Sequence, residues 1–396
     1  MKRLIGILVA LVTAALAAVG PAGAQAQEPV RIGVPMTTSG IAAQVGVDNR
    51  NGIVLAAKQK KTLLGRPIQL LIEDVEGKSE VAVRKAEKMV FKDGAVAILG
   101  VAFSNEGLAI ANEMDRLGVP FLTTNVMTPQ LYGIHKYVFR AGQLADDQTA
   151  TANVKGILAI PDLKKRVFYV LADDYAWGHS CAESFIQLAE KHGIRVHNPK
   201  YDNAALTVTD WSPFVSKVAA SGADAVYSCL RSPIVPRFVK QATEFGLMKR
   251  VKVVAGGSPS EAALESAPET QVGIVTASAW SWDIDTPASR KFAKEYWEEF
   301  KSVPPSQGAQ AYLGAMMLFN AIEKAGSTKP DRIAEALKGS TFDGPYGVVR
   351  ISPKDNSMRT PAVLTETQLA PPNPYGAKIV KKVLVHLKPE EVGPAE

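Results

Sequence analysis

The stretch Ala-Val-Ala-Ile-Leu-Gly-Val-Ala-Phe-Ser-Asn-Glu-Gly, at residues 95–107, decides the fold class of this chain. Residues 95–99 form an uninterrupted apolar run, which is typical of a strand buried on both faces of a parallel sheet. Gly100 then begins a turn of small and polar residues, and a helical pattern follows as far as Leu117. A buried strand followed directly by a helix is the repeating unit of α/β folds.

The same unit recurs on both sides of this stretch. Further strands are predicted at residues 30–34, 68–72, 120–122, 166–171, 194–197, 224–229 and 251–255. The helices predicted between the strands lie at residues 49–61, 80–92, 147–158, 176–192, 210–220 and 235–245. This alternation predicts an α/β fold with parallel sheets and right-handed crossovers.

The last third of the chain departs from this alternation. Long amphipathic helices are predicted at residues 290–300 and 307–325, a shorter helix at residues 330–337, and a strand-like tail at residues 353–396. A chain of 396 residues has the length of two domains, at about 100–200 residues each. Since no linker separates two such domains, we expect the chain to cross between them several times.

The first 26 residues have the pattern of a secretory signal peptide. Lys2 and Arg3 precede an apolar run at residues 4–19, which Gly20 and Pro21 end, and two small-x-small cleavage sites follow. The run is shorter than the roughly 20 apolar residues that a membrane-spanning helix needs. We therefore expect cleavage before residue 25 or 27, export to the periplasm, and a mature protein that is not embedded in the membrane.

The composition is that of an ordinary globular protein, with 46% hydrophobic and 21% charged residues. The formal net charge is +6, and removal of Lys2 and Arg3 with the signal peptide lowers it to +4. The remaining basic residues are scattered along the sequence. We therefore expect no nucleic-acid partner.

Cys181 and Cys229 are the only two cysteines. They cannot supply a zinc site or a C-x-x-C redox pair. Two interpretations remain open. Free thiols buried as small apolar residues are the slightly simpler one, and a disulfide is the alternative that an oxidising compartment permits.

The chain has none of the motifs that common cofactors and catalytic sites require. Its five histidines have no metal-ligand spacing. It has neither a glycine-rich phosphate-binding loop nor the G-x-S-x-G turn that exposes a serine nucleophile. We therefore expect no metal, no cofactor and no enzymatic activity.

Three turns at the carboxyl ends of predicted strands are candidates for a binding site, because open α/β sheets bind ligands there. They lie at residues 100–107, 123–129 and 173–178. Ser104 would stand near the start of a helix, where free N–H groups attract a carboxylate, although it could instead only cap that helix. Trp177 could cover an apolar part of the ligand or pack between the domains.

Six segments carry a family resemblance. They are residues 32–40 (IGVPMTTSG), 48–52 (DNRNG), 104–105 (SN), 174–178 (DYAWG), 221–226 (SGADAV) and 238–242 (FVKQA). Their order and spacing resemble those of the type I periplasmic solute-binding proteins of the leucine/isoleucine/valine-binding group, which serve ABC importers. The resemblance covers nearly all of the mature sequence.

This resemblance implies two Rossmann-like lobes that are joined by a three-strand hinge. Lobe 1 would comprise residues 28–140 and 278–347, and lobe 2 residues 141–277 and 348–396. The hinges would fall at Arg140, Ala141, Gly142, Ala277, Ser278 and Gly347. The implied function is capture of a small ligand by hinge closure, and the implied partner is a membrane permease.

The resemblance also implies ligand contacts at matching positions. These are Val45, Phe103, Ser104, Asn105, Asn125, Val126, Met127, Tyr175, Trp177, Arg231, Gly257 and Trp280. Ser104 and Asn105 would bind the ligand carboxylate, and Arg231 would pair with a second polar group. Met127 and Gly257 replace the threonine and the acid with which amino-acid binders hold the ammonium group, and a buried ammonium without such partners is strongly unfavourable. These departures favour a branched or aromatic carboxylate without an α-amino group, with an amino acid as the alternative.

Two other functions are compatible with an exported α/β protein. The same fold could inform a membrane receptor about a ligand rather than deliver it to a permease. An exported hydrolase is the third candidate, and the missing serine turn and histidine arrangement disfavour it.

Overall fold

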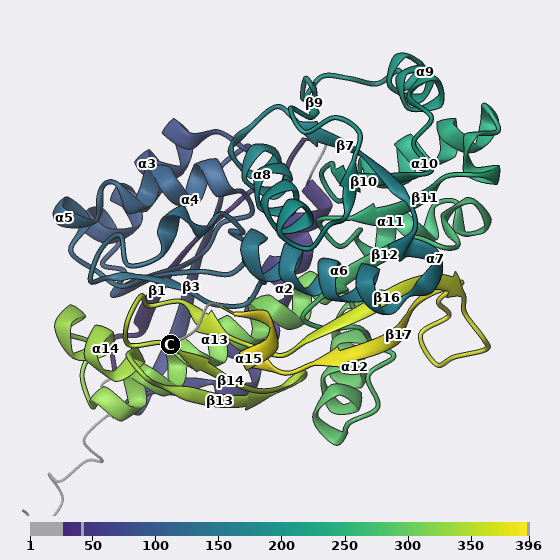
Figure 1. Ribbon diagram of the computed structural model, residues 1–396. Helices are drawn as coiled ribbons and strands as arrows, with labels where there is room; N and C mark the ends of the chain where they lie inside the picture. Colours follow the sequence, from purple (N-terminus) through teal and green to yellow (C-terminus); the bar gives the residue numbers. More distant parts are fainter. Residues whose placement is uncertain (1–26, 41–42, 394–396) are drawn as a thin grey trace, which may run out of the picture.

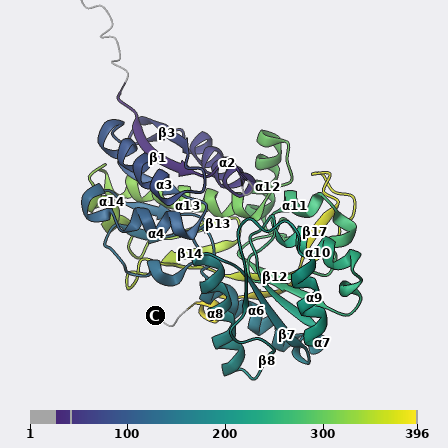
Figure 2. The same cartoon turned by 90° about the horizontal axis from the view of Figure 1, so that it is seen from above.

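The computed structural model describes residues 27–40 and 43–393, so the predicted signal peptide at residues 1–26 lies outside the described residues. The chain folds into two α/β lobes that lie side by side (Figure 1, Figure 2). Each lobe has its own sheet with helices on both faces. The predicted fold class is therefore confirmed, with antiparallel strands added at the sheet edges.

Lobe 1 contains a six-stranded sheet in the order β2-β3-β1-β4-β5-β6. Its strands are β1 (Val30–Met36), β2 (Thr62–Leu63), β3 (Arg66–Asp74), β4 (Ala97–Gly100), β5 (Phe121–Thr123) and β6 (Val138–Arg140). Only the β2–β3 hairpin is antiparallel. The apolar stretch at residues 95–99 supplies most of β4 in the middle of the sheet, where Ile98 and Leu99 are fully buried.

Helices cover both faces of this sheet. They are α2 (Ala43–Lys60), α3 (Ser79–Glu87) with its π-helical continuation (Lys88–Lys92), α4 (Ser104–Ala111), α5 (Met114–Leu117), α12 (Pro287–Phe300), α13 (Ser306–Ala325) and α14 (Pro330–Leu337). The predicted helix that ends at Leu117 is thus divided into α4 and α5. Helices α2 and α13 approach so closely that a Cβ at Gly52 would overlap the carbonyl of Gly308.

Lobe 2 contains a larger sheet in the order β17-β16-β12-β11-β10-β7-β8, with β9 paired to β7. Its strands are β7 (Val167–Asp173), β8 (Arg195–Val196), β9 (Asp202–Ala204), β10 (Ala225–Cys229), β11 (Lys252–Ala255), β12 (Val275–Ser278), β16 (Ala362–Leu369) and β17 (Ile379–Leu387). The strands from β12 to β8 are parallel, and β16 and β17 add antiparallel pairs. The strand-like tail therefore extends this sheet.

The helices of lobe 2 also lie on both faces of its sheet. They are α6 (Asp146–Ala159), α7 (Pro161–Lys164), α8 (Ala176–Lys191), α9 (Ser212–Ser221), α10 (Val235–Glu244), α11 (Glu261–Glu265) and α15 (Pro389–Val392). Helices α6 and α8 share one core cluster with the sheet, whereas α9 and α10 share the other. No helix among the described residues is long and apolar enough to cross a membrane.

The chain crosses between the lobes three times. The first crossing follows β6 at residues 141–145, and the second follows β12 at residues 279–286, close to the predicted positions. Gly142 is required in the first, because it has a φ of +95° and a Cβ there would lie 2.6 Å from the Thr124 oxygen.

The third crossing lies at Thr360–Pro361, so its predicted position at Gly347 is wrong. Gly347 begins β14 (Gly347–Ile351), which pairs with β13 (Thr341–Gly344) and with β15 (Met358–Arg359) in a small separate sheet. Its φ of +100° belongs to the tight turn between β13 and β14. Since Val349, Ile351 and Met358 join the lobe 1 core, this small sheet belongs to lobe 1.

Candidate functional site: a cleft between the lobes

A cleft lies at the carboxyl ends of β4 and β5 of lobe 1 and of β7, β10 and β11 of lobe 2. It is lined by Val45, Ala102, Phe103, Ser104, Asn125, Met127, Gln143, Tyr175, Trp177, Arg231, Ser232, Pro233, Gly257, Ser258 and Gln307. Nine of these residues are among the twelve predicted ligand contacts. The turns that follow the parallel strands of both lobes therefore meet at one site.

Three predicted contacts do not line the cleft. Asn105 turns away and donates a hydrogen bond to Ser79 Oγ. The carbonyl of Val126 accepts hydrogen bonds from the Arg140 guanidinium at 2.7 and 3.2 Å, so this group is already occupied. Trp280 is fully buried in lobe 1, where its indole meets the Phe292 ring edge to face and donates to Ser289.

The lobe 1 wall of the cleft is built on the turn between β4 and α4. Ser104 begins α4, and its Oγ accepts a weak hydrogen bond from the Thr128 amide at 3.4 Å. Its hydroxyl proton therefore stays free to donate into the cleft. The N–H groups of the first helical turn have no partner within the helix, which favours an anionic group beside them.

The Glu106 side chain is buried and lies beside the start of α4. Its carboxyl group accepts hydrogen bonds from the amides of Ala102 and Phe103 at 3.1 Å each, and Thr37 donates to its other oxygen. Burial raises the pKa of Glu106 to about 7. The carboxyl group fixes the β4–α4 turn, and the resemblance gave no indication of this role.

Asn125 and Gln143 add polar groups to the same wall. The Asn125 Nδ2 donates to the Ala102 carbonyl at 2.8 Å, and its Oδ1 is buried without a partner. Gln143 lies in the first crossing, where its Oε1 accepts from the Leu144 amide. Gln143 was missed in the sequence because no local pattern distinguishes a crossing residue whose side chain enters the cleft.

The lobe 2 wall is formed largely by Tyr175 and Trp177 at the start of α8. The centroids of their rings lie 5.9 Å apart, and the Trp177 Nε1 is buried without a partner. Gly257 lies against this indole, since a Cβ at position 257 would be 2.8 Å from Trp177 Cζ2. The wall thus presents an aromatic surface to the cleft.

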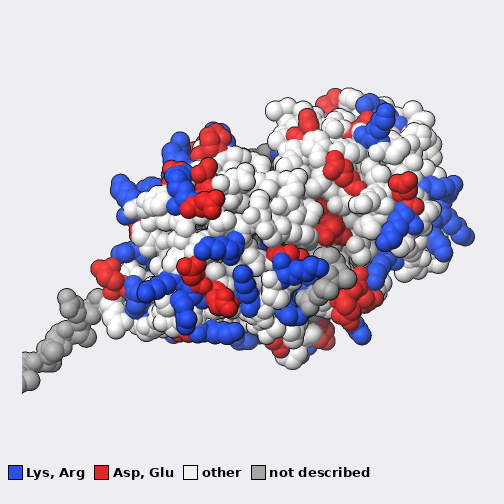
Figure 3. All heavy atoms as spheres, turned by 60° about the vertical axis from the view of Figure 1, so that its left-hand side comes forward, with Lys and Arg blue, Asp and Glu red and all other residues white. Residues whose placement is uncertain are grey.

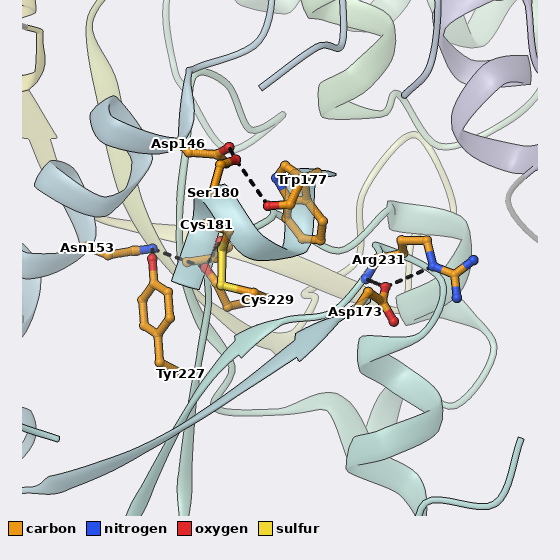
Figure 4. Close-up of a disulfide and its surroundings, with 11 residues drawn as sticks. Asp146, Asn153, Asp173, Trp177, Ser180, Cys181, Tyr227, Cys229 and Arg231 are labelled. Atoms are coloured by element: carbon orange, nitrogen blue, oxygen red, sulfur yellow. Dashed lines mark hydrogen bonds and ion pairs between the residues drawn. A yellow bond between two sulfur atoms is a disulfide. The ribbon is translucent and has the colours of Figure 1, made fainter. Parts of the chain in front are cut away.

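Arg231 is held beside this wall by Asp173 at the end of β7 (Figure 4). The backbone amide and the Nε of Arg231 donate to the same Asp173 oxygen at 2.7 and 2.8 Å, and Nη2 donates to the Leu206 carbonyl at 3.1 Å. Burial raises the pKa of Asp173, although Arg231 opposes this effect. The paired carboxylate keeps the cation in place at the edge of the cleft.

Cys181 and Cys229 form a disulfide in lobe 2, with their Cα atoms 5.8 Å apart (Figure 4). The interpretation of two free thiols is therefore wrong. The bond forms because α8 packs across the carboxyl end of β10, which brings together two residues that are 48 positions apart in the sequence. The spacing of the two cysteines in the sequence does not indicate this contact.

A buried ionic network connects the two lobes behind the cleft. Lys381 of β17 pairs with Glu261 of α11 at 2.9 Å and donates to Ser258 Oγ at 2.8 Å and to Ser306 Oγ at 3.2 Å. Glu261 also accepts from the Ser306 amide at the start of α13 at 3.2 Å. Since Ser306 belongs to lobe 1 and the others to lobe 2, the network holds the lobes together. The tail residue Lys381 was missed because its partners lie far away in the sequence.

The cleft is lined almost entirely by uncharged side chains. Arg231 is the one charged residue among its lining residues, and no carboxylate lines it. The described residues contain no cluster of histidine, cysteine or carboxylate side chains that could hold a metal ion. On the outer surface shown in Figure 3, positive and negative side chains are interspersed.

Comparison with known proteins agrees with this architecture. A family described as periplasmic binding protein matches residues 29–370. The chain belongs to this family. Within it, the chain is a type I periplasmic binding protein of ABC importers, as the resemblance implied.

One curated relative and two solved structures illustrate the similarity. The "Leu/Ile/Val-binding protein homolog 6" of Brucella suis is 26% identical over 371 residues, which are 91% of this chain and 93% of the relative. A solute-binding protein from Rhodopseudomonas palustris HaA2, in complex with p-hydroxybenzoic acid, has a TM-score of 0.83 at 22% identity and covers 93% of this chain and 98% of its own. A leucine-binding protein from Thermotoga maritima has a TM-score of 0.81 at 23% identity and covers 91% of this chain and 99% of its own.

These comparisons establish the class of the protein. It is a periplasmic solute-binding protein of an ABC transporter and binds small ligands. The family consists of binding proteins rather than enzymes. The two solved structures are less than 25% identical to this chain and share its fold, and the ligands in their names belong to those proteins.

Proposed function

We propose that this periplasmic binding protein captures a small aromatic or branched carboxylate that has no α-amino group. The ligand lies in the cleft between the lobes, which close around it about the three crossings. The closed form delivers the ligand to the membrane permease of an ABC importer. The signal peptide at residues 1–26 directs export and is then removed.

The observation that carries this proposal is the imbalance of polar groups in the cleft. The Ser104 hydroxyl and the Arg231 guanidinium offer donors, whereas the one unpartnered acceptor is the neutral Asn125 Oδ1 and no carboxylate lines the cleft to pair with an ammonium group. An ammonium buried without a carboxylate or several acceptors is strongly unfavourable. A carboxylate ligand, in contrast, matches the donors and the start of α4.

The shape of the lobe 2 wall supports a planar or branched apolar group. Tyr175 and Trp177 provide adjacent aromatic rings, and Val45 and Met127 provide apolar contacts from lobe 1. Aromatic rings bury a large apolar area and stack favourably against other rings. The p-hydroxybenzoic acid complex of the Rhodopseudomonas palustris relative shows that this fold accepts such an acid.

The test is a thermal-shift screen of refolded, ligand-stripped protein against amino acids, aliphatic acids and aromatic acids. A ligand at about a hundred times its Kd adds about 2.7 kcal/mol to the free energy of unfolding. We expect stabilisation by aromatic or branched acids and none by the matching α-amino acids. Stabilisation by leucine or valine alone would contradict the proposed ligand class, and stabilisation by no acid would contradict the function itself.

Delivery and export have separate tests. Deletion of the gene should abolish uptake of the radiolabelled acid by cells, and a plasmid copy should restore it. Uptake that continues without the gene would contradict the role in transport. N-terminal sequencing of protein from the periplasm should begin at residue 25 or 27, whereas a start at Met1 would exclude cleavage.

A further inference from the structure

The Cys181–Cys229 disulfide joins two segments that each carry a residue of the cleft. Cys181 lies one helical turn after Trp177 on α8, and Cys229 ends β10 two residues before Arg231. Figure 4 shows the sulfur atoms bonded between α8 and the end of β10. The disulfide therefore links α8, which carries Trp177, to the end of β10, which precedes Arg231.

The two glycines after β11 lie directly against this arrangement. A Cβ at Gly256 would overlap the Cys181 sulfur and would lie 3.2 Å from the Cys229 sulfur. A Cβ at Gly257 would lie 2.8 Å from the Trp177 indole. Neither glycine has a positive φ, so the missing side chains allow close packing rather than an unusual backbone conformation. The backbone after β11 thus contacts both the disulfide and the indole.

A second connection runs between the same two segments. Asp173 ends β7 four residues before Trp177, and it holds both the backbone amide and the Nε of Arg231. The cysteines themselves are buried, with 2% and 0% of their surface exposed, so the disulfide does not contact the ligand space. Its influence on the cleft acts through the residues it holds.

We infer that the disulfide is a positioning element of the ligand site. It fixes Trp177 and Arg231 relative to each other and keeps the indole against Gly257 before any ligand arrives. A site that is already ordered loses less conformational freedom on binding. The role in binding rests on the proposed function, whereas the effect on Trp177 does not require a ligand.

The first experiment therefore measures the ¹⁹F NMR resonance of Trp177 in the ligand-free protein. The five tryptophans are labelled with 5-fluorotryptophan, and the Trp177 resonance in the ¹⁹F NMR spectrum is assigned with Trp177→Phe. In the Cys181→Ala/Cys229→Ala protein, we expect the Trp177 resonance to shift or broaden. The resonances of Trp280, Trp282 and Trp297, which lie in lobe 1 or in the second crossing, should stay in place. An unchanged Trp177 resonance would overturn the inference.

The second experiment measures the Kd for p-hydroxybenzoate and for the best acid of the thermal-shift screen by calorimetry. We expect the double variant to bind about tenfold more weakly than the oxidised protein. Ile157→Ala is the matched control, because it removes buried side chain from the same lobe 2 core on α6, away from the cleft. Equal Kd values for the double variant and the oxidised protein would overturn the role in binding. If the oxidised protein binds no acid but the Trp177 resonance still moves, the proposed function fails and the positioning role stands.

Wild-type protein that is unfolded in urea, reduced with tris(2-carboxyethyl)phosphine and refolded in its presence gives the same comparison without substitution, because the buried disulfide is not accessible to the phosphine in the folded protein. The phosphine takes up the oxygen of a water molecule and becomes its oxide, and the two electrons and two protons released convert the disulfide to two thiols. The reduced protein should match the double variant in both measurements. If both forms lose the lobe 2 fold, judged by far-UV circular dichroism at low temperature, the bond is a folding determinant and the positioning role is overturned.

Discussion

Gly257 and the indole of Trp177 occupy adjoining space so tightly that neither position can gain atoms without moving the other. A Cβ at position 257 would lie 2.8 Å from Cζ2 and 3.1 Å from Cη2 of Trp177. An acidic side chain at position 257 would require the space that the indole fills. The close contact therefore keeps position 257 without a side chain and the indole in its place.

Gly257→Ala should move the indole and weaken binding of the preferred acid. The Cβ must displace the ring or the backbone, since 2.8 Å is shorter than any ordinary carbon contact. We expect Kd to rise about tenfold, or about 1.4 kcal/mol, in calorimetric titrations. The combination with Trp177→Ala should remove this effect, because the Cβ then meets no ring. Additive effects of the two substitutions would contradict direct contact between them.

Trp177→Ala should reduce affinity more than any other single substitution in lobe 2. Removal of a central aromatic contact costs about 2 kcal/mol or more, which is about a 30-fold rise in Kd. Trp177→Phe should recover part of this loss, since it restores a ring without the N–H donor. Trp211→Phe is the control, because Trp211 is also buried in lobe 2 with an unpartnered Nε1 but does not line the cleft. An equal loss of affinity in the control would indicate a general effect on the fold.

Asp146→Asn should change how the stability of the protein depends on pH. Asp146 begins α6 and is buried, which raises its pKa to about 7 from the ordinary value of 3.8. Between these values the unfolded chain releases a proton that the folded protein keeps, so wild-type stability falls as pH rises, by up to about 1.4 kcal/mol for each pH unit. Above about pH 7 this loss is complete and stays constant.

The asparagine does not titrate, so its stability relative to the wild type should increase from pH 4 to pH 7 and then level off. Urea denaturation at pH 4.5, 6 and 8 measures the difference. Asp162→Asn is the control, since Asp162 is an exposed residue of the same lobe that pairs with Arg166. A difference that is the same at all three pH values would show that Asp146 does not carry the effect.

Lys381→Met should destabilise the protein strongly, because it leaves Glu261 buried without its cation. The side chains of this pair are 1% and 5% exposed. Loss of one partner of a buried pair costs about 3–5 kcal/mol, measured by chemical denaturation. The double variant Lys381→Met/Glu261→Gln should recover part of this loss, since no charge then remains unpaired. Lys382→Met changes the next residue, whose side chain is 51% exposed, and should cost less than about 1 kcal/mol. Equal effects at positions 381 and 382 would contradict the role of burial.

The cleft itself was largely predictable, because its walls follow strands that the sequence marks clearly. A buried parallel strand is a continuous apolar run, and the carboxyl ends of such strands meet on one edge of a sheet. The turns after residues 99, 122 and 171 therefore identified both walls of the cleft. Ligand contacts inferred from the family did not hold where another residue already binds the group in question. The Val126 carbonyl, for example, accepts a hydrogen bond from Arg140.

By itself, the amino-acid sequence determined most of the strands and helices, the α/β class and three of the turns that form the cleft, because hydrophobic periodicity and capping act over a few residues. Only the tertiary structure decided the disulfide, the third crossing, the burial of Trp280 and the network around Lys381. Each of these depends on which distant surfaces pack together. Cys181 and Cys229 become neighbours through the packing of α8 on β10, and Lys381 meets Glu261 only after the tail extends the lobe 2 sheet. Contacts of this kind are set by the positions of whole elements, which no local pattern specifies.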